Sequence, residues 1–226
     1  MRTISAIFGK QMADLPKNIS VSFVYILFPI LAFISGRIGG DIAATMASFA
    51  IMTAAVVPMM NIAMTVAEDM EYKSLRFMVM AGVKPIQYLM GIMGFVCLMT
   101  LVPMAVYTYF GEFISQGIFV EIAIVSALSI IASAILGGVI GIFSKNVQQA
   151  TAIYTPAMMA IVFLPMLATI SETVELIASF LFPMQATLIA AYSEADLTRA
   201  IAIIGANIIA LLILFVIAYK KKGLKG

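Results

Sequence analysis

The densest group of ionisable side chains in the sequence lies at 67–87, between two long apolar runs. The acids come first and the bases follow, in the order Glu68, Asp69, Glu71, Lys73 and Arg76. This order predicts a short helix with the acids in its first turn, because the helix dipole stabilises anions there. A downstream Gly and Pro, at Gly82 and Pro85, mark its expected end.

The predicted loop helix is amphipathic. Leu75, Met78 and Val79 share one face, while Tyr72 and Phe77 add bulk. If the helix docks into a cleft of a partner, we expect the apolar face around Leu75 to enter that cleft. The pattern is equally typical of an ordinary interfacial loop helix, and the residues alone favour neither alternative.

Elsewhere the chain has little that could do chemistry. It contains no His, and no Asp, Glu, Lys or Arg lies near the middle of an apolar run. Ionisable residues at membrane depth usually mark proton or ion relays, so a transporter built from this chain needs outside energy or none. The single Cys, Cys97, can form no intrachain disulfide. We predict no catalytic, cofactor-binding or metal-ligating residues.

The elements that must position the 67–87 segment are six apolar runs, at about 19–36, 42–67, 88–110, 118–143, 151–170 and 199–219. Each is long enough to cross a hydrocarbon core of about 30 Å as a helix. Charged residues make up 11% of the 226 residues, against about 25% in soluble domains. The predicted fold is therefore all-α, a single polytopic membrane domain with six transmembrane helices over 1–226.

Lys and Arg predict the orientation of these helices. Eleven of the 13 lie at the termini, in the 68–87 loop or in the 144–150 loop, and only Arg37 and Arg199 lie on the other side. By the positive-inside rule both termini and both loops are cytoplasmic. We therefore expect a multi-pass protein of the plasma membrane that contacts the lipid bilayer and no nucleic acid.

Two further segments flank the predicted spans. Residues 2–17 carry an apolar stripe at helical spacing, which predicts an amphipathic helix lying in the interface, as an anchor or as a lever against a partner. Residues 171–198 hold apolar stretches too short to span, interrupted by acids and Pro183. They predict two short outer helices, interfacial or re-entrant.

The fourth run carries a ridge of small residues at steps of four: Ser129, Ser133, Gly137 and Gly141. Such a ridge lets another helix approach closely in lipid. It predicts either packing within one chain or an interface between subunits.

In several pieces the chain resembles the type-2 ATP-binding-cassette (ABC) exporter permeases. The pieces are Phe8–Leu15, the loop Glu68–Arg76, then Lys84-Pro85-Ile86 and Tyr88-Leu89-Met90-Gly91, then Gly141–Thr151 and Leu164–Ala168. They are spread over most of the chain, from residue 8 to residue 168, and keep the family's order. The family often has Gly-Thr where this chain has Lys73-Ser74, and Lys where it has Ile92.

The resemblance implies that the loop helix is a coupling helix, seated in a separate cytoplasmic ABC ATPase. The residues expected to couple to that ATPase are Glu68, Asp69, Glu71, Tyr72, Ser74, Leu75, Arg76 and Phe77. ATP and Mg²⁺ would belong to the partner, since the one Gly-Lys pair, Gly9-Lys10, is not part of a phosphate-binding loop. Six spans make half a transporter, so a second permease subunit, identical or related, is also implied.

A substrate path between such subunits would be lined by apolar and mildly polar side chains. Candidates in the second and fifth runs are Asn61, Thr65, Tyr154, Thr155 and Pro156. Without a buried charge on the path, the expected cargo is hydrophobic or amphipathic: a peptide, a lipid-like molecule or a drug.

Two other classes of function stay open. An ion-coupled secondary transporter would need an ion site near midplane, and the runs offer no carboxylate for one. A non-transporting membrane scaffold or immunity protein would need neither an ATPase nor a coupling loop. Association with an ATPase that depends on the 67–87 loop would distinguish the permease from both.

Overall fold

A computed structural model describes residues 2–14, 19–168, 170–191 and 196–222, and every element in these ranges is an α-helix. The helices are α1 (Arg2–Asp14), α2 (Ile19–Gly39), α3 (Ile42–Glu71), α4 (Ser74–Met80), α5 (Pro85–Phe110), α6 (Phe119–Phe143), α7 (Val147–Ala168), α8 (Glu172–Ala178), α9 (Phe182–Ala191) and α10 (Leu197–Lys222). Residues 15–17 of the predicted interfacial helix, 169 of the fifth run and 192–195 of the outer segment lie outside the described residues.

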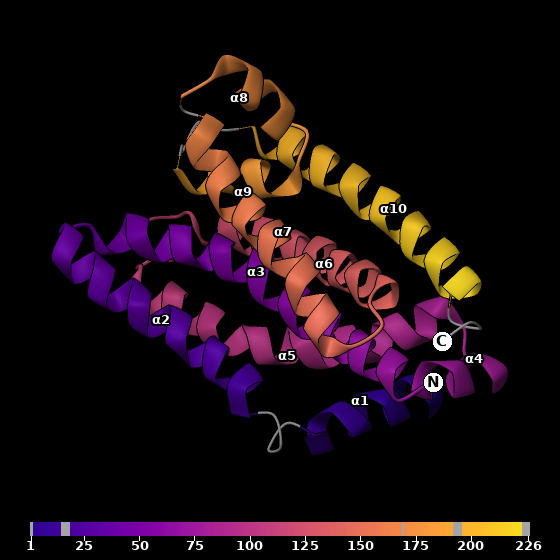
Figure 1. Ribbon diagram of the computed structural model, residues 1–226. Helices are drawn as coiled ribbons and strands as arrows, with labels where there is room; N and C mark the ends of the chain where they lie inside the picture. The colour runs from indigo at the N-terminus through magenta and orange to yellow at the C-terminus, as the bar shows by residue number, and fades with distance from the viewer. Residues whose placement is uncertain (1, 15–18, 169, 192–195, 223–226) are drawn as a thin grey trace.

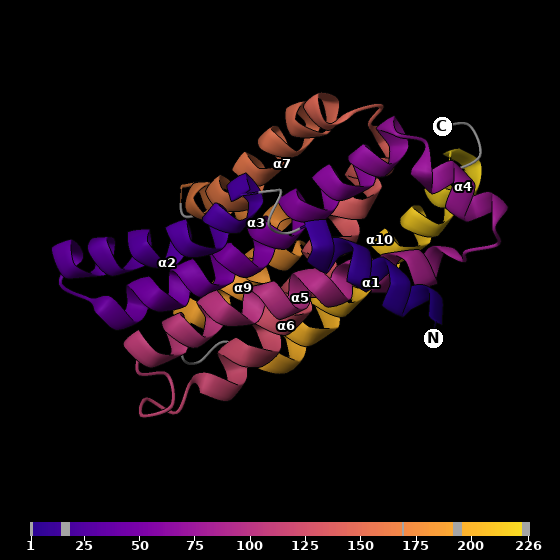
Figure 2. The same ribbon diagram turned by 90° about the horizontal axis from the view of Figure 1, so that it is seen from below.

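Helix α3 is the centre of the bundle. It begins at Asp41, whose side chain accepts a 2.9 Å hydrogen bond from the Ala44 N–H and so caps the first turn. It packs against α2, α5, α6, α7 and α9, with α6 as its most extensive neighbour. Figure 1 and Figure 2 show α3 enclosed by these helices in two perpendicular views.

Five helices are long and apolar enough to cross a membrane: α3, α5, α6, α7 over Val147–Pro165, and α10. They identify the chain as a membrane-embedded helical protein. The apolar stretch Phe23–Gly39 of α2 is shorter, and it overlaps the first predicted run. Helices α8 and α9 are bent by 104° at the break between them, the geometry of a broken span or a re-entrant loop.

The small-residue ridge of α6 faces α3 within the chain. A Cβ built on Gly137 would lie 2.9 Å from the Met59 Cα, and one on Gly141 would lie 2.5 Å from the Val66 Cβ. The Ser133 hydroxyl donates a 2.9 Å hydrogen bond to the Ala54 carbonyl, and Ser129 is fully buried. Because these side chains of α6 are small, the backbones of α6 and α3 can approach each other closely.

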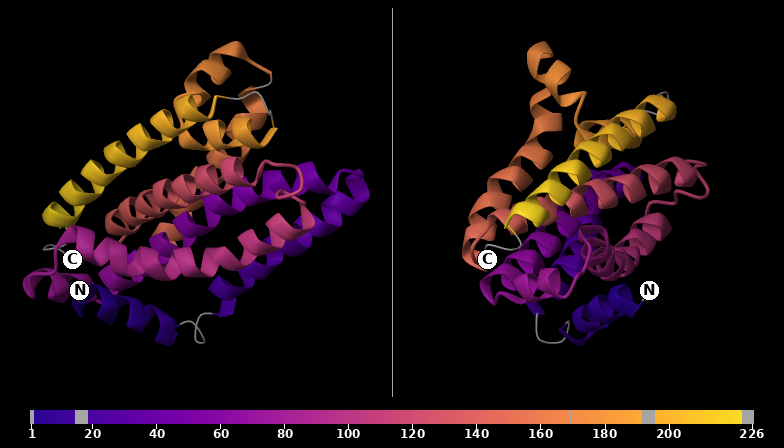
Figure 3. Two further views of the ribbon diagram at one scale, coloured as in Figure 1. Left: turned by 180° about the vertical axis from the view of Figure 1, so that it is seen from behind. Right: turned by 90° about the vertical axis from the view of Figure 1, so that its right-hand side faces the viewer.

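Helix α1, helix α4 and the end of α10 gather at one end of the bundle (Figure 1). Seen from behind in Figure 3, α10 runs along the outside of the bundle and ends close to α4, while α8 lies at its other end. Helix α1 lies against α5. The loop that carries the charged cluster of the sequence, with α4 in it, therefore lies at the same end of the bundle as α1 and the end of α10.

Candidate functional site

The acidic residues of the loop end α3 rather than begin α4. We expected Glu68, Asp69 and Glu71 in the first turn of the loop helix, and that expectation is wrong because α3 continues through Glu71. Its hydrogen bonding extends to the Tyr72 N–H, which donates to the Glu68 carbonyl at 3.0 Å. Lys73 then adopts the left-handed conformation, with φ 59°, and α4 starts at Ser74.

This position is unfavourable for a carboxylate, because the end of a helix carries partial negative charge. Asp69 is nevertheless buried, with 2% of its surface exposed. Its Oδ1 accepts hydrogen bonds from the Lys10 ammonium and the Ser74 hydroxyl, both at 2.6 Å, and its Oδ2 accepts one from the Tyr88 hydroxyl at 2.7 Å. Three donors thus compensate the buried charge and join α1, α3, α4 and α5.

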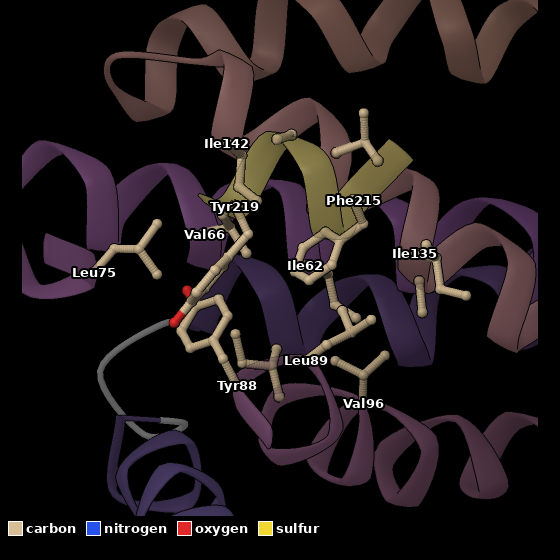
Figure 4. Close-up of a cluster of buried hydrophobic side chains, with 14 of the residues drawn as sticks. Ile62, Val66, Leu75, Tyr88, Leu89, Val96, Ile135, Ile142, Phe215 and Tyr219 are labelled. Atoms are coloured by element: carbon tan, nitrogen blue, oxygen red, sulfur yellow. The ribbon is translucent and has the colours of Figure 1, made fainter. Parts of the chain in front are cut away.

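Helix α10 joins the same group through aromatic side chains. The rings of Tyr88 and Tyr219 lie 5.6 Å apart, and the Tyr219 hydroxyl donates a 3.2 Å hydrogen bond to the Val83 carbonyl, just before α5. Figure 4 shows Tyr219 and Phe215 from α10 reaching toward Tyr88 and Leu89. Asp69 and these contacts tie four helices, α1, α3, α5 and α10, to the loop that contains α4.

Two close approaches hold α1 in place on α5. A Cβ on Gly91 would lie 2.7 Å from the Ile7 Cβ, so only glycine allows α1 to lie this close. Nearby, the rings of Phe8 and Phe95 meet edge to face at 6.5 Å. The contact between α1 and α5 places Lys10 beside Asp69.

Glu71 connects α3 to α7. Its Oε2 accepts a 3.2 Å hydrogen bond from the Val147 N–H, the first of α7. A carboxylate is favourable at this position, because the start of a helix carries partial positive charge.

Helix α4 has an inner and an outer face. Leu75 is 0% exposed and packs with Val66, Tyr88 and Tyr219 in the main core cluster, where Met78 and Val79 are partly buried. The outer face is formed by Phe77, which is 66% exposed, together with Arg76 and Met80. Tyr72, in the turn before α4, is 71% exposed. Two aromatic side chains, Tyr72 and Phe77, are thus exposed in this charged loop.

The inner position of Leu75 corrects the expectation that its face enters a partner's cleft. The apolar stripe of α4 is buried against the spans of the same chain. An amphipathic pattern is the same whether the helix packs on its own spans or in a partner's cleft. Asp69 and Ser74, also expected to couple to a partner, likewise face inward and position the loop. Among the expected residues, Glu68, Glu71, Tyr72, Arg76 and Phe77 remain exposed.

The candidate path residues fall into two groups. Asn61 is buried, and its amide donates a 2.6 Å hydrogen bond to the Tyr25 hydroxyl of α2. Tyr154 packs instead against Met59 and Ala63, which lie on the opposite side of α3 from Asn61. The two residues therefore do not share one lining.

The other path candidates lie toward the surface. Thr65 and Thr155 are half-buried and Pro156 is exposed, and the Thr155 hydroxyl donates to the Thr151 carbonyl at 2.7 Å. The part of α7 that could span a membrane is the least buried of the five long helices. This leaves the Tyr154–Pro156 region with a free surface in the single chain.

Sequence reasoning missed Lys10, Tyr88 and Tyr219 as partners of the loop. Lys10 and Tyr88 do lie inside two pieces of the family resemblance, which was the available signal. In the described ranges, no three His, Cys, Asp or Glu side chains come together as a metal site. Comparison of the sequence with protein-family models and with curated proteins finds no match.

Proposed function

We propose that this chain is the membrane-spanning permease subunit of an ATP-driven exporter of the type-2 ABC class. In this account it crosses the plasma membrane six times with both termini in the cytoplasm. Helix α4 is its coupling helix, and a separate cytoplasmic ATPase binds and hydrolyses ATP.

One observation carries the proposal: three separate pieces of the family resemblance meet at Asp69. Lys10 comes from Phe8–Leu15, Ser74 from the loop, and Tyr88 from the Tyr-Leu-x-Gly piece, and each donates a hydrogen bond to that one carboxylate. The glycine of the last piece, Gly91, lies directly against Ile7 of α1. Pieces that are scattered in the sequence thus build one structural unit around α4.

The backbone at Lys73 gives independent support. Its φ of 59° lies in the left-handed region, which glycine adopts without steric cost. The family often has glycine at this position. This chain has lysine in place of that glycine, yet its backbone adopts the left-handed conformation that glycine favours.

The arrangement suits transmission of force between a partner and the spans. A partner that binds Arg76 and Phe77 of α4 and Tyr72 in the turn before it would pull on the ends of α3 and α5 directly. The contacts of Asp69 and Tyr219 would carry the same movement to α1 and α10. Rigid packing beneath an exposed tip is what such coupling requires.

The cargo would be hydrophobic or amphipathic, because the long spans bring no ionisable side chain to mid-depth. We propose that a second permease subunit covers the exposed surface of α7 around Tyr154, Thr155 and Pro156, and that the path runs between the two. Asn61 lies on the other side of α3 from Tyr154, so it could line a path only on that other side.

The test is ATPase activity of the purified complex of this chain with its ATPase in lipid vesicles. Phe77→Ser and Arg76→Glu should abolish the part of the ATPase activity that is stimulated by transport. Neither should change the yield of folded chain, since both side chains are exposed. Tyr109→Ser removes an equally exposed aromatic at the far end of α5 and should change nothing. Equal effects of Phe77→Ser and Tyr109→Ser would contradict the proposal.

A further inference from the structure

A hollow of about 400 Å³ opens beside the end of α3, where three segments of the chain converge. Met70 and Glu71 contribute from the last turn of α3 and Lys73 from the turn before α4. Lys145 contributes from the loop between α6 and α7, and Lys222 from the end of α10. None of the contacts described around Asp69 uses these lysines.

The hollow is basic. In the described part of the chain, the side chains of Lys73, Lys145 and Lys222 lie more than 4.0 Å from any carboxylate oxygen. The one acid of the lining, Glu71, already accepts the Val147 N–H of α7. Three ammonium groups against one carboxylate leave the lining with an excess of positive charge.

The same hollow has an apolar side. Ile142 is buried, and Phe143 is 43% exposed at the end of α6, with Met70 beside them in the lining. The Lys222 ammonium lies 4.4 Å from the centroid of the Phe143 ring, a cation–π contact that holds the charge above an apolar surface. Basic groups next to apolar ones, at the ends of the long apolar helices α3, α6 and α10, match the boundary between lipid headgroups and acyl chains.

Lys73 is a costly choice for the fold alone. Its left-handed backbone would suit glycine better, and strained positions of this kind cluster at binding sites. A lysine at this point is explained if its ammonium group has a ligand.

We infer that this hollow binds the phosphate group of an anionic phospholipid, whose acyl chains lie against Phe143 and the adjoining helices. Basic pockets between transmembrane helices recognise anionic headgroups in this way. The inference does not depend on the proposed function, since it needs only a membrane-embedded chain. A bound lipid at this point would join the α3–α4 turn, the α6–α7 loop and α10.

The test uses the purified full-length chain in neutral detergent, titrated with phosphatidylglycerol and, in parallel, with phosphatidylcholine of the same acyl length. Bound lipid is counted by native mass spectrometry. We expect one phosphatidylglycerol per chain, bound about tenfold or more tightly than phosphatidylcholine. Binding of the two lipids with equal affinity would overturn the inference.

Two triple variants separate the hollow from general basic charge. Combined Lys73→Gln, Lys145→Gln and Lys222→Gln should weaken phosphatidylglycerol binding on the order of 100-fold, since each lysine near a membrane surface contributes about fivefold. The matched control, Lys84→Gln with Lys220→Gln and Lys221→Gln, removes the same charge outside the lining and should keep binding within about twofold. Equal losses in the two variants would show diffuse attraction only and would overturn the inference.

Two further arms identify the occupant. Excess inorganic phosphate should fail to displace the lipid, and full displacement would assign the site to a free anion instead. A photoactivatable phosphatidylglycerol should label the chain at 142–147, and labelling elsewhere would contradict the assignment. If the first triple variant binds lipid normally but loses a partner ATPase, the hollow is a protein contact and the lipid site is refuted.

Discussion

The Tyr88 hydroxyl donates a 2.7 Å hydrogen bond to Asp69 Oδ2, joining the first turn of α5 to the last turn of α3. The two helices are the ones that the α4 loop connects. Because Asp69 is buried and Tyr88 fully so, the bond is shielded from water, and the loop cannot move as a flexible appendage. Any movement of α4 must also move the ends of these two helices.

Asp69→Asn should destabilise the chain. The carboxylate accepts from three donors, and an amide in its place turns an N–H₂ toward at least one of them. A lost hydrogen bond to a charged group costs about 1.5–3 kcal/mol, so the Tm in detergent should fall by roughly 5 °C. Asp41→Asn is the control, because Asn caps a helix as well as Asp does. An unchanged Tm for Asp69→Asn would show that the contacts around Asp69 add no stability.

Lys73 can be replaced by glycine but not by a β-branched residue. Lys73→Gly relieves the left-handed strain, which costs about 1–2 kcal/mol in an L-residue, and should keep or raise the Tm. Lys73→Val adds branching at the same φ and should lower the Tm. A higher Tm for valine than for glycine would mean that the turn before α4 is not left-handed in the membrane.

Gly137→Leu should disrupt the bundle, because a side chain there meets the Met59 backbone of α3. The loss in free energy of unfolding should reach about 3 kcal/mol, the upper range for overpacking, and Ser133→Leu should act in the same direction. The matched control is Gly205→Leu in α10, where a Cβ would meet no atom within 4 Å. Thermal unfolding and size-exclusion profiles compare the variants, and normal behaviour of Gly137→Leu would show that α6 does not pack on α3.

The orientation in the membrane is tested by cysteine labelling in a Cys97→Ser background. A membrane-impermeant maleimide added to intact cells should label Ser115→Cys and should label Arg76→Cys only after the membrane is opened. Both positions are exposed, so access depends on the side of the membrane alone. Labelling of Arg76→Cys from outside would contradict the proposed cytoplasmic location of α4.

The sequence predicted the all-helical, membrane-embedded class because apolar runs of about 20 residues leave few other structures possible. It also predicted a helix in the 67–87 loop, where the structure has α4, and a ridge of small residues on the fourth run, which the structure packs against α3. Periodicity and small-residue spacing are local properties, which is why a single sequence reveals them.

The sequence could not place the ends of the loop helix or its buried face. The acids at 68–71 fit the first turn of a new helix, and their actual place at the end of α3 depends on Lys10 and Tyr88, which are distant in sequence. An apolar stripe such as Leu75, Met78 and Val79 is the same whether it packs on its own spans or on a partner. Asn61 and Tyr154 likewise fit one path in sequence, and only the packing of α3 puts them on opposite sides.

The most direct test of the account is site-specific photocrosslinking from the tip of α4 in intact cells. A photoreactive amino acid at Phe77 should crosslink to a separate chain that contains the G-x-x-x-x-G-K-[ST] phosphate-binding loop, identified by mass spectrometry of the adduct. The same amino acid at Tyr109 should give no such adduct. Crosslinks from Phe77 only to lipid, or to proteins without that loop, would contradict the proposal that this chain is an ABC permease subunit.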